Sequence, residues 1–354
     1  MRRLTYGKLT SISIIGLTLL PLANAADLEN ELAQYKSQLS ATLSQQKAPS
    51  QNFDLTKWKI NLPVPDHRPS RLGDVMEINA TQLNDVARPF TDYFWFYTDP
   101  LTGAMVMKSP NTAPTTANSK NARSELRAML SSNDNVTPSD PSNNFAIAAN
   151  PQRAKYGAIG GQLSATVAVD WVSTNGDDSK FPSHSVVVGQ IHGAKTEPLK
   201  IYYRKLPAHD TGSLFWNYEV TPKDVSQRYD VPHLIWGETN LTAKDLAPKD
   251  GIKLGELFSY DIHVEQNIMT LTFIKHPGTR FSQTKTFTTD LSKGLPGHPK
   301  DVGFANDTMY FKAGAYNQCN QGKEHPIWGT ACNNDGVEAG DYTQVSFYRL
   351  SLKQ

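Results

Sequence analysis

The chain has 354 residues, enough for one large domain or two ordinary ones, and its 35 basic and 34 acidic side chains leave a formal net charge of +1. Only 19% of the residues are charged, which excludes a disordered tail and a strongly basic nucleic-acid-binding protein. The 23 glycines, 22 prolines and 10% aromatic residues favour a turn-rich β protein over a helical bundle.

The first 25 residues have the three parts of a secretory signal peptide. A basic start (Arg2, Arg3 and Lys8) precedes an apolar stretch over residues 12–22 and the small-residue cleavage motif Ala-Asn-Ala over residues 23–25. The apolar stretch is shorter than the ~20 residues that a membrane-spanning helix needs, and no later stretch is long enough. We therefore expect a secreted protein, periplasmic or extracellular, with no membrane partner. Cleavage would remove three basic residues and no acidic one, which turns the net charge from +1 to −2.

Residues 26–52 are expected to form an amphipathic helix and a linker. From Asp27 to about Gln46, apolar residues recur at spacings of three or four and form a thin stripe: Leu28, Leu32, Tyr35, Leu39 and Leu43. The linker over residues 47–52 contains Pro49. We expect this helix to pack on the main domain or to act as a spacer.

From Phe53 onward the apolar pattern changes to period two, which indicates β-strands. Clusters of Gly, Pro, Asn and Asp separate the runs, and no long helical stretch alternates with them. We expect strands over residues 162–172, 183–192, 199–205, 258–266, 268–275, 308–316 and 342–352, with irregular loops over 205–213 and 221–257. The expected fold class is all-β, and residues 53–354 are expected to form one sandwich of antiparallel sheets.

The two cysteines, Cys319 and Cys332, lie close together near the C-terminus. In an exported protein the even count predicts a disulfide that closes a short polar loop. A metal site or a catalytic thiol would call for Cys-x-x-Cys spacing or a pair of histidine ligands, and His325 alone does not supply that.

Several familiar chemistries have no motif in this chain. There is no phosphate-binding Gly-x-x-x-x-Gly-Lys loop, no His-Glu-x-x-His zinc helix and no Gly-x-Ser-x-Gly nucleophile elbow. No strand carries two closely alternating acids, the arrangement that a β-sandwich glycoside hydrolase would use. Hydrolysis by paired carboxylates is therefore disfavoured.

Three segments could place polar groups on one face of a strand. In Gln190-Ile191-His192, period-two geometry points Gln190 and His192 the same way and Ile191 into the opposite layer. In the run over residues 310–318 the same rule aligns four side chains, and Gly314 leaves space for a ligand between them. The four are Tyr310, Lys312, Tyr316 and Gln318.

The third segment, Arg123-Ser124-Glu125-Leu126-Arg127, is ambiguous. As a strand it would align Arg123, Glu125 and Arg127, but Leu126, Met129 and Leu130 also fit a helical stripe. Each of the three segments also has an ordinary structural interpretation. A Gln-x-His pair is usually a hydrogen-bonded or solvated face, Arg-x-Glu-x-Arg is usually a surface ion-pair ladder of little energy, and a strand-end tyrosine usually packs. Their occurrence together is less easily explained by chance.

The combination resembles the alginate lyases of polysaccharide lyase family 7, which carry Arg-Ser-Glu-Leu-Arg, Gln-Ile-His and Tyr-Phe-Lys-Ala-Gly-x-Tyr-Asn-Gln in this order. All three stand here, at 123–127, 190–192 and 310–318, and residues 54–63 look like the family's first strand. The resemblance covers roughly residues 53–354. It implies a β-jelly roll whose concave sheet holds the substrate, and it implies a strand at the arginine motif. Ala122 and Ala128 depart from the family's usual Pro and Glu, which puts a flanking contact in doubt.

The resemblance assigns four catalytic positions: Arg123, Gln190, His192 and Tyr316. Elimination from a uronate removes the weakly acidic C5 proton and expels O4, so the neighbouring carboxylate must be neutralised. By position, Arg123 and Gln190 are the neutralising donors, and His192 is the base at neutral pH. Tyr316 would protonate O4, since a tyrosine hydroxyl has an ordinary pKa of about 10, and on mannuronate it could serve as both base and acid. No metal and no cofactor are then expected.

A polyanion that binds a nearly neutral protein requires cations clustered at the site. Arg127 and Lys312 are the candidates within the motifs, and Lys200, Tyr202 and Arg204 would share one face of the next strand, although an ordinary solvated face fits these three nearly as well. Glu125 is expected to orient the two arginines. The expected substrate-binding residues are Glu125, Arg127, Lys200, Tyr202, Lys312 and Gln318.

The sequence thus predicts a secreted, monomeric, endo-acting alginate lyase whose partner is an anionic polysaccharide and not a nucleic acid. By the family's pattern, Ile191 is associated with guluronate-containing substrate, whereas Val there goes with mannuronate. The alternatives are a lyase for another polyuronate, such as glucuronan, and a non-catalytic carbohydrate-binding sandwich. A binding module would need exposed aromatic residues but neither His192 nor Tyr316.

Overall fold

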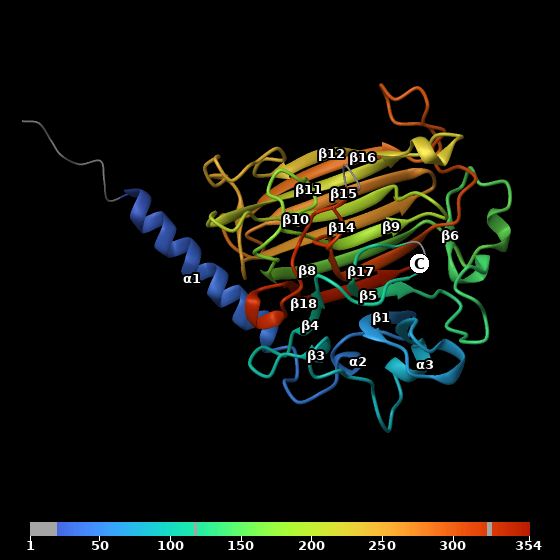
Figure 1. The fold of residues 1–354 in the computed structure, drawn as a ribbon, viewed down its shortest axis with the longest axis horizontal. Coiled ribbons are helices and arrows are strands. Elements are labelled where there is room, and N and C mark those ends of the chain that lie inside the picture. Colours follow the sequence, from blue (N-terminus) through green and yellow to red (C-terminus); the bar gives the residue numbers. More distant parts are fainter. Residues whose placement is uncertain (1–19, 117–118, 324–327) are drawn as a thin grey trace, which may run out of the picture.

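The computed structural model describes residues 20–116, 119–323 and 328–354, which form two large antiparallel sheets packed face to face (Figure 1). The larger sheet has the strand order β12-β11-β10-β9-β17-β5-β1-β2, with β13 paired to β11, and the other has the order β16-β15-β14-β8-β18-β4-β3. A short parallel pair, β6-β7, stands apart. The all-β prediction is confirmed.

The strands of the larger sheet are β1 (Trp58–Pro65), β2 (Val75–Ile78), β5 (Arg123–Ala128), β9 (Ser185–His192), β10 (Leu199–Arg204), β11 (Thr211–Val220), β12 (Tyr229–Trp236), β13 (Ile252–Lys253) and β17 (Tyr310–Asn317). The second sheet contains β3 (Phe96–Thr98), β4 (Met105–Pro110), β8 (Gly161–Trp171), β14 (Leu257–Glu265), β15 (Ile268–Lys275), β16 (Gln283–Asp290) and β18 (Tyr342–Lys353). The parallel pair is β6 (Phe145–Ala146) and β7 (Ala158–Ile159).

Helical segments are few in the described chain. The α-helices are α1 (Leu20–Ser40), α2 (Pro49–Asn52) and α3 (Ala80–Leu83), and single 3₁₀ turns are η1 (Pro69–Arg71), η2 (Pro141–Asn143), η3 (Arg153–Lys155), η4 (Val225–Gln227) and η5 (Val337–Ala339). No helix among the described residues is both long and apolar enough to cross a membrane.

The hydrophobic core lies between the two sheets. In β14 and β15, buried and partly exposed residues alternate, so one face of each strand packs on the core and the other points outward. In β5, β9 and β17, core residues such as Leu126, Ile191 and Ala313 alternate with the polar residues of the motifs. Those polar residues therefore lie on the face of the larger sheet that points away from the core, which we call the polar face.

The predicted loop over residues 221–257 is wrong in part, because it contains strand β12 and the short β13. Strand β11 also has no counterpart among the predicted strands, and nine of its ten residues are buried. Since this strand is covered on both faces, its sequence shows no period-two alternation to find. The arginine motif is a strand, β5, paired with β1 and β17.

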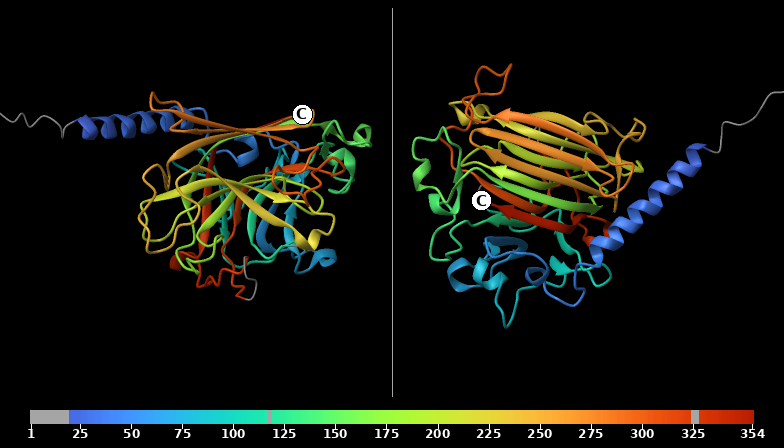
Figure 2. Two further views of the ribbon diagram at one scale, coloured as in Figure 1. Left: turned by 90° about the horizontal axis from the view of Figure 1, so that it is seen from above. Right: turned by 180° about the vertical axis from the view of Figure 1, so that it is seen from behind.

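The N-terminal helix begins and ends earlier than the range from Asp27 to about Gln46, and the expected linker contains α2. Helix α1 packs on the second sheet through Leu39 and Tyr35. Leu39 belongs to a small buried cluster with Ala104, Ala168, Leu257 and Tyr348, and Tyr35 packs against this cluster. Ion pairs also hold it, from Glu29 to Lys253 and from Glu31 to Arg280. Its first turns extend beyond the sheets (Figure 2). Most of the expected signal peptide, residues 1–19, lies outside the described residues, and its last residues begin α1.

Candidate active site

The three motifs lie on adjacent strands in the middle of the larger sheet, where β17 runs between β9 and β5 (Figure 1). The register sets Tyr316 opposite Arg123, Gly314 opposite Glu125, Lys312 opposite Gln190 and Tyr310 opposite His192. Residues 118 to 193 positions apart in sequence thus meet on one face because three strands pair in this order. All four expected catalytic residues belong to this group.

Glu125 is the centre of the cluster, and its side chain is fully buried. Its Oε2 lies 3.1 Å from Arg123 Nη1 and also contacts Lys312 Nζ, while Gln190 Nε2 donates to its Oε1. Burial opposes the charge of Glu125, but Lys312 and Arg123 together hold its pKa below the ordinary value. Glu125 therefore orients Arg123, Lys312 and Gln190. The expectation that it orients Arg127 is wrong.

Gly314 does not leave open space, because a side chain there would collide with β5. A Cβ at this position would lie 2.5 Å from the Ser124 carbonyl oxygen and 2.6 Å from the Glu125 Cα. The glycine therefore allows close approach of β17 and β5 at the point where Glu125 sits, which replaces the predicted role of making room for a ligand.

Arg123 has one guanidinium donor with no partner among the described residues. Its Nη1 donates to Glu125, its Nη2 donates to Ser119 Oγ at 2.7 Å, and its Nε is buried without an acceptor. A buried unpaired donor is costly unless a ligand or water completes it. The same guanidinium lies 3.9 Å above the ring of Tyr316, so the cation and the tyrosine hold each other in place.

Tyr316 is half-buried, and its hydroxyl lies 3.2 Å from Ser119 Oγ. Ser119 was not among the predicted site residues, although it contacts both Arg123 and Tyr316. It lies in the loop before β5, four residues from Arg123, and a single serine in a polar loop gives no signal in the sequence. Only the folded loop brings it to the site.

His192 is partly accessible, with 26% of its side chain exposed. The ring stacks on Tyr310 with centroids 5.0 Å apart. Its Nδ1 faces the Gly193 carbonyl oxygen, and its Nε2 lies 3.0 Å from Glu197 Oε1. Burial lowers the pKa of His192, Glu197 raises it in opposition, and Lys312 lowers it further.

Three acidic residues that the motifs do not include surround Lys200: Glu197, Glu219 and Asp230. Lys200 contacts two of them, with Nζ 3.5 Å from Glu197 Oε2 and 3.1 Å from Asp230 Oδ1. The backbone N–H of Glu197 donates to Glu219 Oε2 at 2.9 Å. Lys200 therefore already has two carboxylate partners, which is not what a free subsite cation would show. Glu197 lies in a six-residue loop without a motif, so sequence reasoning could not place it.

The remaining predicted binding residues are held by protein groups. Arg127 donates to the carbonyl oxygens of Ala128 and Pro138 and to Asn144 Oδ1, and it stacks on Tyr310 at 3.9 Å. Burial, with the nearby Arg123, lowers the pKa of Lys312 to about 8. The lysine therefore loses its charge within the neutral-to-alkaline range.

Tyr202 and Gln318 are buried on the polar face and packed against protein groups. Tyr202 is 1% exposed and packs between Phe215 and Phe181. Gln318 donates to the Tyr316 carbonyl oxygen at 3.3 Å and is also nearly inaccessible. Arg204, on the same strand as Tyr202, donates to loop carbonyl oxygens and is buried as well. The alternative of a solvated face is therefore wrong for Tyr202 and Arg204, because both are buried.

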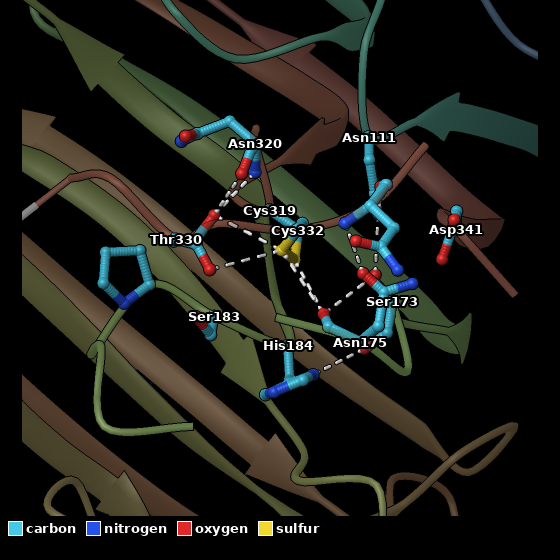
Figure 3. The surroundings of a disulfide bond; sticks show 12 residues. Asn111, Ser173, Asn175, Ser183, His184, Cys319, Asn320, Thr330, Cys332 and Asp341 are labelled. Atoms are coloured by element: carbon cyan, nitrogen blue, oxygen red, sulfur yellow. Dashed lines mark hydrogen bonds between the residues drawn. A yellow bond between two sulfur atoms is a disulfide. The ribbon is translucent and has the colours of Figure 1, made fainter. Parts of the chain in front are cut away.

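The predicted disulfide between Cys319 and Cys332 is present, directly after β17 (Figure 3). Around it, Asn320 Nδ2 donates to Asn121 Oδ1 at 2.7 Å, and the Asn320 backbone N–H donates to Thr330 Oγ1 at 2.7 Å. Since Asn121 stands two residues from Arg123, the loop that the disulfide closes is tied to the segment that carries Ser119.

One cavity, of about 670 Å³, lies away from this cluster, between the end of α1 and the outward face of the second sheet. Its walls include Tyr35, Ser164, Thr272 and Arg349, and none of the motif residues lines it. The polar face therefore stands as the candidate active site on the chemistry of its side chains, not on cavity size.

Comparison with known proteins agrees with this arrangement. A family model described as "Alginate lyase" matches residues 53–354. An alginate lyase from Klebsiella pneumoniae is 33% identical over 314 residues, 86% of this chain and 90% of that protein. The crystal structure of a Klebsiella pneumoniae alginate lyase matches with a TM-score of 0.69 and 30% identity, covering 86% of this chain and 98% of that one. The crystal structure of the exolytic PL7 alginate lyase AlyA5 from Zobellia galactanivorans matches with a TM-score of 0.68 and 31% identity, covering 86% of this chain and 97% of that one. The chain is thus a jelly-roll polysaccharide lyase and belongs to the alginate lyase family.

Proposed function

We propose that this enzyme cleaves alginate by β-elimination on the polar face, and that Arg123 and Gln190 neutralise the substrate carboxylate. The observation that carries the proposal is the buried, unpaired Nε of Arg123. In this cluster the single negative charge of Glu125 neutralises only part of the positive charge of Arg123 and Lys312. A uronate carboxylate supplies the missing acceptor and the missing negative charge.

The proposed reaction is balanced without water. The base removes the proton on C5, the electron pair forms the C4–C5 double bond, and the C4–O4 bond breaks. The leaving O4 then takes a proton from the acid. Because charge develops on the carboxylate as the C5 proton leaves, fixed donors at that carboxylate stabilise the transition state more than the ground state.

We assign the proton transfers to the two accessible polar groups of the cluster. His192 is the base, since its burial favours the neutral imidazole that accepts a proton near pH 7. Tyr316 is the acid that protonates O4, and Arg123 together with Ser119 fixes its ring and hydroxyl. On mannuronate, Tyr316 would serve as both base and acid.

The proposal includes a preference for guluronate-containing blocks, carried by Ile191. This side chain is fully buried in the core and points away from the polar face. Any effect on specificity must therefore act through the position of the β9 backbone, which carries Gln190 and His192 on either side. Replacement of Ile191 by Val tests this: we expect a smaller ratio of activity on polyguluronate to activity on polymannuronate, and an unchanged ratio would contradict it.

We further propose that the protein is secreted after cleavage following residue 25 and acts as a monomer within the polymer chain. The leader in the sequence supports export. Product length tests endo action, because an endo enzyme first yields mixed oligomers and an exo enzyme yields one small product from the start. The similarity to an exolytic enzyme makes this measurement informative.

The variant His192→Ala separates an enzyme from a carbohydrate-binding module. We expect it to lose turnover on polyguluronate by at least about 100-fold, the usual contribution of general base catalysis, while retention of alginate on the protein is unchanged. Activity on glucuronan but not on alginate would favour the other polyuronate. Equal turnover of the variant and the parent enzyme on polyguluronate would contradict the assignment of the base.

A further inference from the structure

His192 contacts Glu197, a residue to which the proposed reaction gives no role. Glu197 follows His192 by five residues, in the loop that joins β9 to β10, and its Oε1 lies 3.0 Å from His192 Nε2. Both side chains are largely buried, with 26% and 19% exposed. A charge pair in such a setting is screened far less than one on the surface.

The two ring nitrogens of His192 have partners that together fix where its protons lie. The Gly193 carbonyl oxygen can only accept, so Nδ1 carries a hydrogen. A neutral ring would then point the lone pair of Nε2 at a carboxylate oxygen, which is repulsive. A second proton at Nε2 turns the same contact into a charge-assisted hydrogen bond. Ionised Glu197 therefore stabilises the imidazolium that forms when His192 accepts a proton, and it opposes burial and Lys312, which lower the pKa of His192.

Neighbouring groups keep Glu197 ionised. Burial opposes its charge, but Lys200 and His192 hold its pKa well below the ordinary value. Burial raises the pKa of the adjacent Glu219, whose Oε1 lies 3.2 Å from Arg228 Nε. The Oε2 of Glu219 accepts a hydrogen bond from the backbone N–H of Glu197 at 2.9 Å. The carbonyl oxygen of Glu197 accepts one from the backbone N–H of Glu219 at 3.0 Å. These contacts hold Glu197 in place, and its ionised carboxylate lies beside His192.

Charged and titratable groups of the neighbouring strands also act on His192, directly or through Glu197, and they oppose one another. The cations lower its affinity for a proton, and the carboxylates raise it. Tyr310 and Lys312 on β17 and Arg123 on β5 act on His192 directly. The other charged groups act through these or through Glu197: Glu125 on β5, Lys200 on β10, Glu219 on β11 and Asp230 on β12. Glu197 is the carboxylate in direct contact with the ring.

We propose that Glu197 is a positioning residue that holds the imidazole of His192 by its Nε2 and stabilises the proton there, so that it sets the pH range in which His192 can act as base. The proposal rests on the assignment of His192 as the base in the proposed function. Glu197 acts through His192 and does not itself touch the sugar. Lys200 and Glu219 act one step further away, by keeping Glu197 ionised and in place.

The test compares the pH dependence of kcat/KM for the parent enzyme and for Glu197→Gln. The acidic limb of kcat/KM follows protonation of the base in the free enzyme. Loss of the carboxylate removes the favourable partner of the imidazolium, so His192 loses its proton at lower pH. We expect the acidic limb to move to lower pH by at least about one unit, the usual effect of one nearby charge. A residue with a merely structural role would lower activity without moving the limb.

Two further variants serve as controls. Glu256→Gln removes a matched pair elsewhere, since Glu256 Oε1 lies 3.0 Å from His276 Nε2 with both groups largely buried, and it should leave the limb in place. Glu197→Asp keeps the charge and should bring the limb back toward that of the parent enzyme. An unmoved limb in Glu197→Gln, with activity retained, would overturn the inference while the proposed function stands.

Nuclear magnetic resonance of protein with ¹⁵N-labelled histidine provides a readout that does not need activity. The His192 signals are assigned by their loss in His192→Gln. In the parent protein we expect Nδ1 to stay protonated throughout and Nε2 to titrate, at lower pH in Glu197→Gln. A neutral His192 that carries its proton on Nε2 would overturn the inference, even if Glu197→Gln fails to fold. Absence of elimination activity in the parent enzyme would instead count against the proposed function.

Discussion

Replacement of Glu125 by glutamine tests whether the buried charge cluster stabilises the enzyme as the structure indicates. The carboxylate is fully buried and contacts Arg123 at 3.1 Å as well as Lys312 and Gln190. At an effective dielectric constant of about 20, two unit charges at that distance attract by roughly 5 kcal/mol. Desolvation offsets much of this attraction, but removal of one partner leaves two buried cations uncompensated, which costs about 3–5 kcal/mol.

The assay is urea unfolding followed by tryptophan fluorescence, at pH 6 and at pH 9. At pH 6 we expect Glu125→Gln to lose about 3–5 kcal/mol of unfolding free energy and to melt roughly 6–10 °C lower. At pH 9 the loss should be smaller. Lys312 already has a pKa of about 8 in the parent enzyme, so at pH 9 this lysine is mostly neutral. A neutral Lys312 no longer needs the charge of Glu125, and its part of the loss disappears.

An exposed ion pair provides the control for Glu125→Gln. Glu29 pairs with Lys253 at 3.4 Å, but 70% of its side chain is exposed. We expect Glu29→Gln to change the unfolding free energy by under about 0.5 kcal/mol. If Glu125→Gln costs as little as Glu29→Gln, or costs the same at pH 6 and pH 9, then the buried cations are compensated by other groups and the reasoning is refuted.

Three further variants probe the site and its support. Because Lys312 has a pKa of about 8, KM for alginate in the parent enzyme should rise as pH passes 8, whereas Lys312→Arg should bind with little change over pH 7–9, and parallel KM curves would count against this. Tyr316→Phe should lower kcat by at least about 100-fold at similar KM, and an unchanged kcat would remove Tyr316 as the acid. Conversion of Cys319 and Cys332 to serine should cost roughly 3 kcal/mol in urea unfolding, and an equal midpoint with the parent protein would show that the disulfide adds nothing.

The sequence is sufficient to predict the all-β fold wherever one face of a strand is solvated, because period-two alternation survives there. Strands β14 and β15 were predicted nearly to the residue for this reason. Strand β11 is buried on both faces, so its alternation is lost, and β12 starts with exposed residues around Pro232. The arginine motif could be placed on a strand only through the resemblance to the family.

The motif residues were predicted, but their mutual contacts were not. Period two aligned Arg123 with Glu125, whereas the contact of Glu125 with Lys312 and Gln190 depends on the strand order β9-β17-β5. The same limit applies to groups outside motifs. Ser119 and Glu197 lie in loops, and only the folded chain shows that one contacts Tyr316 and the other His192.

The expected binding set shows a second limit of pattern reasoning. Alternation correctly put Lys200 and Tyr202 on the polar face, but it does not report what covers them. Asp230 and Glu197 hold Lys200, and aromatic side chains cover Tyr202. A residue on the correct face is therefore available to substrate only if loops and neighbouring strands leave it unpaired, which one strand's sequence cannot show.

The most direct test of the central claim follows the ultraviolet absorbance of the new C4–C5 double bond while purified protein acts on polyguluronate and polymannuronate. The proposed elimination predicts a rise in absorbance that matches the number of new chain ends, faster on polyguluronate, with unsaturated products one water molecule lighter than hydrolysis products. New reducing ends without any rise in absorbance would mean that the glycosidic bond is hydrolysed, and that result would contradict the assignment of Arg123, Gln190, His192 and Tyr316 to an elimination.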